Sequence, residues 1–441
     1  MLFQQFLRLS LFAHLKVGLV LTIGLSACVS MEKDQVPTSI SNDIVIDLNR
    51  LTYSIANEHD QFYSFIGVRA LSMVHLAMHN AFNAITPEFT TYIFEDKAKD
   101  ADPIAAAATS TQLILEKAYP ARKDTIAMVC SRWLSQIEEG EAKEKGIALG
   151  KKVANQLIAM REGDGHEKQG DYTPMTKPGD YQYTPGFDYV WKPDFTFARP
   201  FTLDSVSQFR SPTPPPFESD TYQESYEEVK LYGKKGSQER SAEQTHIGHW
   251  WAEFGEHSWN RIGRITAVEK NLSLRESARL FALLNMNLYD LYLVSFDSKY
   301  HYDTWRPYTA IREADRDNNP NTLADLQWEP EMVTPPWPEY PSAHAAVGAA
   351  GAEIVASVFG TTAVDFTMTS VTAEPPGSER SYTNLDQVAD HCADSRIWNG
   401  YHFRFATEEG KKQGRQLASF VLNNFLLPLD KQKKDQELTH N

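Results

Sequence analysis

Residues 341–352 read PSAHAAVGAAGA, a run of small residues that opens with a serine and a histidine. Ser342 is a typical N-cap residue, so we expect a helix to begin after it and to end near Phe359. The small side chains allow a second helix to approach closely. At the start of this helix the free amides, including that of Ala343, would point outward at an anion. His344 lies in the first turn, where an imidazole beside an anion can donate or accept a proton.

A second block, residues 299–307, reads KYHYDTWRP. Lys299 and Arg306 are seven positions apart, a spacing at which two side chains on one helical face point the same way. Pro307 biases Arg306 out of the helical conformation. Both cations could therefore reach a common ligand from a helix end, whereas a lone pair of this kind would be a solvated basic patch.

A third block, residues 395–402, reads SRIWNGYH. Arg396 and His402 are six positions apart, so they cannot share a face of an unbroken helix. The Asn-Gly pair at 399–400 supplies a bend or a fresh helix start, after which His402 opens the final helix. Arg396 can then bind two oxygens of an anion, and His402 can approach its central atom as a ligand or a nucleophile.

The remaining sequence is helical in pattern, and strand-like alternation is almost absent. Ser273 and Glu276 have the spacing of a capping box, which marks the start of the helix that ends near Lys299. Apolar residues recur at helical spacing over residues 69–85, 104–118, 141–160, 243–268 and 274–294. The predicted fold class is all-α, a helical bundle with two helical subdomains.

Residues 163–236 differ from their surroundings because they are crowded with proline, glycine and aromatic residues. The segment is too long for a simple connector, and its aromatic content favours an ordered irregular segment packed over the helices. It would form a lid or wall of a site, or a plain structural wrap.

The first 27 residues carry two basic residues, no acid and a short apolar run at 17–25, as in a signal peptide. The block Leu25-Ser26-Ala27-Cys28 resembles a bacterial lipobox, in which the cysteine is lipidated and becomes the new N-terminus. This implies an extracytoplasmic lipoprotein, anchored at the periplasmic face or the cell surface. An ordinary secretory signal or a short anchor is the alternative.

The predicted organisation follows from these features. The ranges are a lipoprotein signal peptide at 1–27, a tether at 28–45, an N-terminal helical subdomain at 46–236 that includes the irregular segment, a C-terminal helical subdomain with the oxyanion site at 237–430, and a tail at 431–441. At 441 residues and 42% hydrophobic content the chain can bury a sizeable core.

The formal net charge of -15 at pH 7 argues against a nucleic-acid partner and against loose adsorption to an acidic membrane surface. It also sets the cationic blocks apart from the rest of the chain. Besides Cys28, the cysteines are Cys130 and Cys392, which could form one disulfide or stay free. Neither lies in a recognisable nucleophile context.

Taken together and in this order, the three blocks resemble the signature of the vanadium-dependent haloperoxidase family, whose superfamily includes type 2 phosphatidic acid phosphatases and bacterial acid phosphatases. The family pattern is Lys, six residues, Arg-Pro; then Pro-Ser-Gly-His; then Ser-Arg, five residues, His, three residues, Asp. Residues 198–217, ARPFTLDSVSQFRSPTPPPF, also resemble secreted bacterial members, so the likeness covers most of the chain after the leader.

The resemblance implies that the site holds vanadate and that phosphate can occupy it too. His402 would be the axial ligand to vanadium, His344 the acid–base group, and a protonated Lys299 would polarise bound peroxide. Halide attack on the polarised oxygen would give hypohalous acid. The residues expected to hold the oxyanion are Lys299, Arg306, Ser342, Ala343, Arg396 and His402.

Two positions depart from the family pattern. Ala343 stands in place of glycine, which a helix N-terminus tolerates. Ala406 stands in place of an aspartate that orients the axial histidine, so His402 must bond a backbone carbonyl, water or another acid. The candidate acids are Glu408, Glu409 and Asp390.

Trp337 and Trp305 flank the blocks. As walls of the site they would keep water out, which suits halide oxidation more than entry of a phosphate ester. They could equally be core aromatics.

Three functions are compatible with these residues. The first is peroxide-driven oxidation of halide to hypohalous acid by a vanadium-dependent haloperoxidase. The second is an acid phosphatase or phosphatidic acid phosphatase-like hydrolase in which His402 forms a phosphohistidine. The third is a non-catalytic lipoprotein that binds an oxyanion. The expected partners are hydrogen peroxide and halide, or a phosphate ester, together with the membrane through Cys28 and a second copy of the chain in a homodimer.

Overall fold

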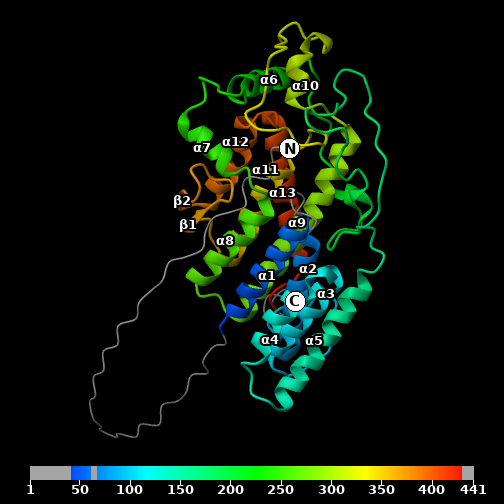
Figure 1. Cartoon of the computed structure of the whole chain (residues 1–441), viewed down its shortest axis with the longest axis vertical. Coiled ribbons are helices and arrows are strands. Elements are labelled where there is room, and N and C mark those ends of the chain that lie inside the picture. Colours follow the sequence, from blue (N-terminus) through cyan, green and yellow to red (C-terminus); the bar gives the residue numbers. More distant parts are fainter. Residues whose placement is uncertain (1–40, 61–66, 430–441) are drawn as a thin grey trace, which may run out of the picture. The chain divides into compact units, whose positions relative to one another are not determined.

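The longest helix that the structure describes, α9 (Leu274–Tyr302), is buried along most of its length. The structure is a computed structural model and describes residues 41–60 and 67–429. These residues belong to one compact unit, and its elements are almost all helices (Figure 1). The all-α class expected from the sequence is therefore confirmed.

The other helices precede or follow α9 in the sequence. The helices that precede it are α1 (Asp43–Asp60), α2 (Val68–Ile85), α3 (Pro103–Ala118), α4 (Lys123–Leu134), α5 (Glu141–Met160), α6 (Asp220–Tyr232), α7 (Ala242–Trp250) and α8 (Gly255–Glu269). Those that follow are α10 (Pro307–Arg312), α11 (Ala343–Phe359), α12 (Leu385–Trp398) and α13 (Arg404–Asn424). Between α11 and α12, β1 (Phe366–Thr369) pairs with β2 (Glu379–Tyr382) in antiparallel register.

A capping box starts α9, as predicted. The Ser273 hydroxyl accepts a hydrogen bond from the Glu276 amide at 3.2 Å, and the Glu276 carboxylate accepts one from the Ser273 amide at 2.9 Å. The helix continues past Lys299 to Tyr302 and ends at Asp303, which has a left-handed conformation with φ 49°. Because α9 contacts α2, α8, α11 and α13, it places Lys299 in the interior.

The small-residue helix α11 packs against α13, α12 and α9. It begins after Ser342 and ends at Phe359, as predicted. A side-chain carbon on Gly351 would lie 2.1 Å from the Trp259 ring, and one on Gly414 of α13 would lie 2.1 Å from the Ala346 carbonyl oxygen. Both contacts are closer than any side-chain carbon permits, so glycine is what allows these helices to approach.

The helix expected over residues 243–268 is wrong as a single element, because the chain breaks between α7 and α8. The Glu253 carboxylate stabilises the break by accepting hydrogen bonds from the Val371 amide at 3.0 Å and the Ser258 hydroxyl at 2.6 Å. This break frees the carbonyl of Trp251 for contacts in the site described below.

The irregular segment is shorter than the predicted 163–236, because α6 occupies residues 220–232. Ser219 caps this helix by accepting a hydrogen bond from the Tyr222 amide at 3.2 Å. The proline-rich run just before it masks the helical pattern in the sequence.

Several predicted features fall outside the described residues. These are the signal peptide at 1–27, Cys28 and the tail at 431–441. Because α1 begins at Asp43, the last residues of the predicted tether are helical. The division between subdomains at residue 236 stays a prediction. Within the described ranges, no helix combines the length and apolar character that a membrane span needs.

Cys130 and Cys392 are buried and free, so they do not form the disulfide that the sequence allowed. The Cys392 thiol instead donates a hydrogen bond to the His344 carbonyl oxygen at 3.5 Å.

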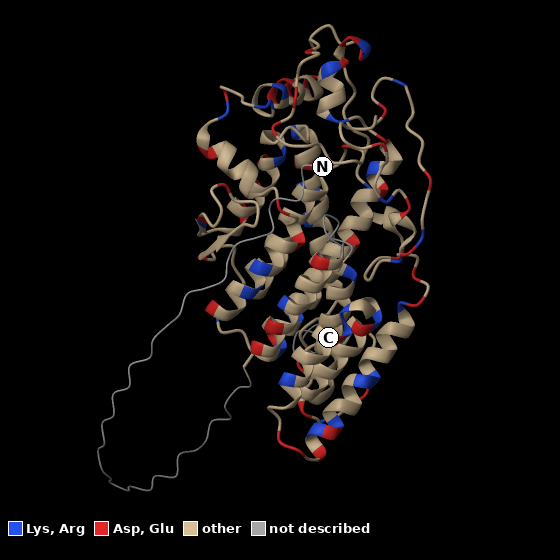
Figure 2. Cartoon of the chain, in the orientation of Figure 1, with Lys and Arg blue, Asp and Glu red and all other residues tan. Residues whose placement is uncertain are grey.

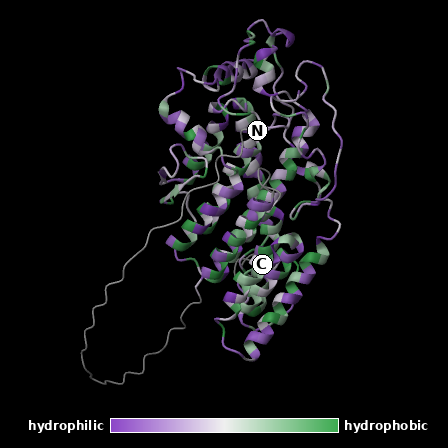
Figure 3. Ribbon diagram, viewed as in Figure 1, coloured by the Kyte–Doolittle hydropathy of each residue, from purple (hydrophilic) through white to green (hydrophobic). Residues whose placement is uncertain are grey.

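Charged residues of both signs are interspersed on outer helices such as α5 (Figure 2), and polar and apolar residues alternate along α8 (Figure 3).

Close contact between α11 and α13 predicts that Gly414→Ala destabilises the protein. The added carbon would meet the backbone of Ala346, which cannot move without shifting α11. We expect the free energy of unfolding to fall by about 1–3 kcal/mol, measured by chemical denaturation. The control Gln416→Ala, at an exposed position of the same helix, should change it by less than about 0.5 kcal/mol. Equal stability of the two variants would contradict the packing argument.

Candidate oxyanion site

Lys299 lies in the last turn of α9 and its side chain is fully buried. Its Nζ donates to the carbonyls of Pro338 at 3.0 Å, Glu339 at 2.7 Å and Pro341 at 2.6 Å. All three ammonium hydrogens are therefore used by neutral acceptors. Burial, and then the charge of Arg306, lower the pKa of Lys299 well below its usual value, so a nearby anion would favour its charged form.

Arg306 directly precedes α10, and its backbone is extended (φ -79°, ψ 157°), as Pro307 predicts. Its Nε donates to the Trp337 carbonyl at 2.8 Å. Nη1 donates to the Tyr401 carbonyl at 3.0 Å and lies 3.2 Å from Nε2 of His402. Nη2 is buried and has no hydrogen-bond partner among the described residues. Burial lowers the pKa of Arg306 to about 10, so the guanidinium stays charged at neutral pH.

Arg396 lies in the last turn of α12 and is 5% exposed. Its Nε donates to the Ser395 hydroxyl at 3.0 Å, and Nη2 donates to the Trp251 carbonyl. The guanidinium carbon lies 5.3 Å from the centre of the Tyr401 ring. Burial lowers the pKa of Arg396, and no acidic side chain forms an ion pair with it among the described residues.

His402 lies in the turn between α12 and α13, so it does not open the final helix as predicted; α13 begins at Arg404. The turn at Asn399-Gly400 is present, with Gly400 at φ 79°. A side-chain carbon on Gly400 would lie 2.6 Å from the Gly233 carbonyl oxygen, so this turn requires glycine.

The contacts of the two ring nitrogens determine the tautomer of His402. Nδ1 lies 2.7 Å from Glu339 Oε1, which also accepts from the Phe403 amide at 3.1 Å. A carboxyl oxygen can accept from Phe403 and still donate to Nδ1, so the position of the hydrogen follows from the other ring nitrogen. Arg306 has only donors, so Nε2 is an acceptor. His402 is thus the neutral Nδ1–H tautomer with its Nε2 lone pair toward Arg306.

The pKa of His402 shows which of the predicted site residues lie near its ring. Burial lowers the pKa of His402 well below its usual value. Nearby groups lower it further, and these are Arg306, Lys299, Arg396 and His344. Charge effects weaken with distance, so residues of all three sequence blocks lie near enough to His402 to act on it, and Arg306 contacts it directly at 3.2 Å.

Ser342 caps α11 as predicted, because its hydroxyl accepts a hydrogen bond from the Ala345 amide at 3.3 Å. Its own amide donates to the Ala406 carbonyl at 3.0 Å, which ties the start of α11 to α13. Ala343 is the first residue of α11, where an amide has no acceptor within the helix.

His344 lies in the first turn of α11, with Nε2 buried and without a hydrogen-bond partner among the described residues. Burial, and then the charge of Arg396, lower the pKa of His344 well below its usual value, while a hydrogen bond to the Trp251 carbonyl opposes the shift. The ring is therefore neutral and free to accept a proton.

The acid beside His402 is Glu339, which the sequence analysis did not identify. Its side chain is fully buried, and burial raises its pKa to about 7. The acids predicted for this role pair elsewhere: Glu408 with Lys411 at 3.0 Å, Glu409 with Lys412 at 3.6 Å and Asp390 with Lys411 at 3.1 Å. One signal could have revealed Glu339, since it is an acid only three residues before Ser342.

Both tryptophans are buried among other aromatic rings. The Trp337 ring packs against Trp191 and Phe296, with centroids 6.2 Å and 5.9 Å apart, while its carbonyl holds Arg306. Trp305 packs against Phe217 at 5.3 Å. Trp337 thus contacts the site through its backbone.

The irregular segment braces the turn between α9 and α10. The Trp305 amide donates to the Gly179 carbonyl and the Tyr181 amide to the Asp303 carbonyl, each at 2.7 Å. The Tyr172 hydroxyl donates to the Asp303 carboxylate at 2.6 Å. This turn connects Lys299 to Arg306, so the segment helps fix their separation; its role as a lid stays a prediction.

The donor set fits an oxyanion such as vanadate or phosphate. The guanidinium Nη2 of Arg306 and Nε2 of His344 are buried polar atoms that lack a protein partner in the described ranges. Buried polar groups are normally hydrogen-bonded, so these two atoms indicate a missing ligand. In the same part of the chain, no cluster of His, Cys, Asp and Glu could hold a metal cation instead.

Comparisons with known proteins agree with this reading. A model of the vanadium chloroperoxidase N-terminal domain matches residues 40–188, and a model of the VCPO second helical-bundle domain matches residues 279–429, which include the whole site. The vanadium chloroperoxidase of Curvularia inaequalis is 25% identical over 393 residues, which cover 71% of this chain and 64% of that protein. The chain thus matches less than two thirds of that relative's length.

Two solved structures share the fold. The first bacterial vanadium-dependent iodoperoxidase superposes with a TM-score of 0.75 at 24% identity, over 90% of this chain and 99% of that chain. An apo-type bacterial vanadium-dependent chloroperoxidase superposes with a TM-score of 0.66 at 14% identity, over 80% and 92%.

Arg306→Lys tests the donor set because it keeps the charge and removes Nη2 and the planar fork. We expect the affinity of the purified protein for inorganic phosphate, measured by calorimetry, to fall about tenfold or more. The control Arg312→Lys changes an arginine of α10 that donates to Glu329 at 3.1 Å, and it should keep the wild-type affinity. Equal affinities of the two variants would show that Arg306 does not contact the anion.

Proposed function

The chain belongs to the vanadium haloperoxidase family, and from this premise we propose that it is a vanadium-dependent haloperoxidase that oxidises halide with hydrogen peroxide to hypohalous acid. One observation carries the proposal. Lys299, Arg306 and Arg396 are buried, their charges all act on the neutral His402 ring, and their hydrogen-bond partners are mainly neutral backbone carbonyls. A site with this charge favours a multiply charged oxyanion.

The residues of the chain fit vanadate in distinct ways. Arg306 Nη2 would donate to an oxygen of the anion without giving up another bond. Lys299 contributes its charge, because carbonyls already accept its hydrogens. His402 would hold the central atom through Nε2, which now faces Arg306 Nη1 at 3.2 Å. Arg396, Ser342 and the Ala343 amide complete the proposed set.

Vanadate, when bound, supplies the Lewis acid that activates peroxide toward halide. The neutral His344 would accept the proton that peroxide gives up in the site, at its unpartnered Nε2. The anion's charge in turn stabilises the protonated forms of Lys299 and His344, which opposes the effect of burial on both pKa values. His344 can therefore return the proton to the product.

The same geometry supports a second candidate, hydrolysis of a phosphate ester. Nε2 of His402 carries the lone pair that a phosphohistidine mechanism needs, and the cations would hold phosphate as they hold vanadate. Family membership favours the haloperoxidase. The homodimer stays a prediction.

The full chain, purified in detergent and freed of bound anions, should gain peroxide-dependent bromination or iodination when orthovanadate is added. Inorganic phosphate should inhibit by competing for the same donors. His402→Ala should lose this activity by about tenfold or more, because a charge-assisted ligand contact is removed. Glu408→Gln, a surface change that leaves the site intact, should keep it.

The assay also separates the alternatives. Aryl-phosphate hydrolysis that orthovanadate inhibits, without halogenation, would replace the proposal by the phosphatase. Anion binding without either reaction would favour the non-catalytic oxyanion-binding lipoprotein.

We also propose that Cys28 is lipidated and anchors the protein outside the cytoplasm, as the Leu25-Ser26-Ala27-Cys28 block suggests. The start of α1 at Asp43 supports this, because it leaves a stretch of chain between the anchor and the first helix. 

Expressed in a bacterium, the Cys28→Ser protein should no longer incorporate labelled palmitate. The control Cys130→Ser, at a buried free cysteine, should be labelled as the wild type is. Labelling of the Cys28→Ser protein would rule out Cys28 as the acylated residue.

A further inference from the structure

We propose that Glu339 is the positioning residue of the oxyanion site, fixing the ring orientation and tautomer of His402 in place of the acid that the chain lacks at position 406. The contact with His402 Nδ1 measures 2.7 Å. The inference rests on the proposed function only for the identity of the oxyanion, because the contact exists in the protein itself.

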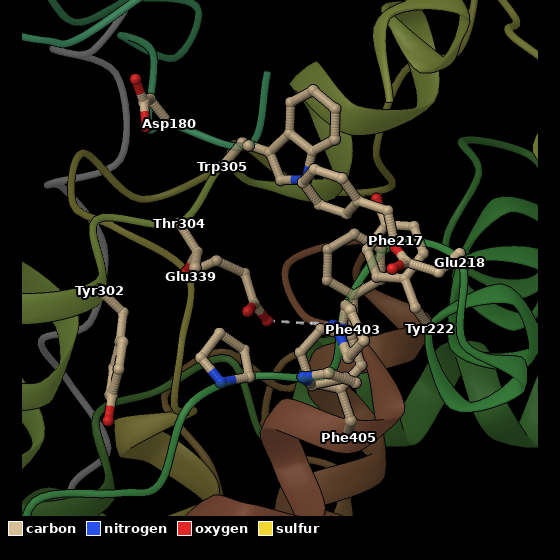
Figure 4. Close-up of a pocket in the computed structure, with 14 residues that line it drawn as sticks. Asp180, Phe217, Glu218, Tyr222, Tyr302, Thr304, Trp305, Glu339, Phe403 and Phe405 are labelled. Carbon is tan, nitrogen blue, oxygen red and sulfur yellow. Dashed lines mark hydrogen bonds between the residues drawn. The ribbon is translucent and has the colours of Figure 1, made fainter. Parts of the chain in front are cut away.

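A second donor contacts the same carboxylate oxygen, and Arg306 decides which ring nitrogen of His402 carries the hydrogen. The Phe403 amide donates to the same oxygen, Oε1, at 3.1 Å (Figure 4, dashed line). Nε2 of His402 lies 3.2 Å from Arg306 Nη1, which can only donate, so Nε2 is an acceptor and the neutral ring carries its hydrogen on Nδ1. His402 therefore donates from Nδ1 to Oε1, and Nε2 is the ring nitrogen that faces Arg306.

The backbone of Glu339 is held on both sides, which makes its side chain a rigid support. Its amide donates to the Thr304 carbonyl at 2.9 Å, and its carbonyl accepts from Lys299 Nζ at 2.7 Å. The next amide, of Tyr340, donates to the Thr304 hydroxyl at 3.0 Å. One residue therefore sets the positions of a site cation and of the axial histidine.

The surroundings of Glu339 limit competing donors. Its side chain lines a cavity of about 380 Å³ whose walls include Trp305, Tyr222 and Phe403 (Figure 4). The second carboxylate oxygen, Oε2, is buried and has no hydrogen-bond partner among the described residues. Oε1 thus has two donors, and no lysine or arginine in the described ranges forms an ion pair with Glu339 that would draw it from His402.

Ala406 lies near the start of α13, where this helix meets α11. Ala406 is fully buried, and its carbonyl accepts from the Ser342 amide at 3.0 Å. One turn further along α13, a side-chain carbon on Gly410 would lie 2.3 Å from the Ser342 carbonyl oxygen. Position 410 therefore requires glycine, and the acid beside His402 comes from the segment before Ser342.

Two substitutions of Glu339 separate positioning from a general structural role. Glu339→Leu removes the acceptor, whereas Glu339→Gln keeps an oxygen that can accept from Nδ1. In the full-length protein, labelled with ¹⁵N-histidine, we expect the wild type to show His402 as the Nδ1–H tautomer, the leucine variant to lose this preference and the glutamine variant to retain it. Glu408→Gln is the matched control.

Binding of inorganic phosphate is the second readout, because it requires neither vanadate nor turnover. Affinity should fall about 10–100-fold in the leucine variant and about fivefold in the glutamine variant, which replaces a charge-assisted bond by a neutral one. Haloperoxidase activity is measured separately, so a protein that binds phosphate but does not halogenate would refute the proposed function and leave the positioning role standing.

An unchanged tautomer and unchanged phosphate affinity in Glu339→Leu would overturn the proposal, as would an equal loss in the Glu408→Gln control. Should the leucine variant fail to fold, the glutamine variant decides. Wild-type affinity and an unshifted His402 ring signal in that variant would then overturn the inference, and a fivefold loss with the tautomer retained would support it.

Discussion

Buried cations held by backbone carbonyls are the constraint on which the rest of the site depends. Carbonyl oxygens keep Lys299 and Arg306 in place, but they do not cancel charge as carboxylates would. A buried charge is unfavourable unless several acceptors surround it, so the fold must supply them at defined positions. Residues 337–341 supply carbonyls to both cations. The positive potential that remains is available to an oxyanion.

Close helix packing holds residues 337–341 in a fixed position relative to the third sequence block, residues 395–402. Glycines and alanines let α11 and α13 approach until backbone touches backbone, as at Gly414 and Ala346. The Ser342 amide then bonds the Ala406 carbonyl, so the first turn of one helix is fixed to the start of the other. The small-residue run therefore does more than provide free amides. It sets the distance between His344 and His402, which lie on different elements.

Much of this arrangement could be predicted from the sequence, because capping residues and motif spacing act locally. Ser273 and Ser342 mark helix starts through bonds to residues three positions away, and Pro307 determines the backbone of its neighbour. The break after Trp250 was not predictable in the same way, because Glu253 stabilises it through a loop more than a hundred residues distant. Glu339 was missed for a related reason, since its partner is 63 positions away.

The orientation of His402 requires an acceptor close to Nδ1 in space, and not an acid at a particular position of the sequence. Its tautomer depends on an oxygen within hydrogen-bond distance of Nδ1 that cannot itself donate there, and any segment that brings such an oxygen satisfies the requirement. Comparison of motifs position by position finds the acid missing at Ala406, whereas the fold supplies one from Glu339. Because Glu339 also binds Lys299 through its backbone, the cation and the imidazole share a support. Their contributions to anion binding are therefore coupled and should not add as independent terms.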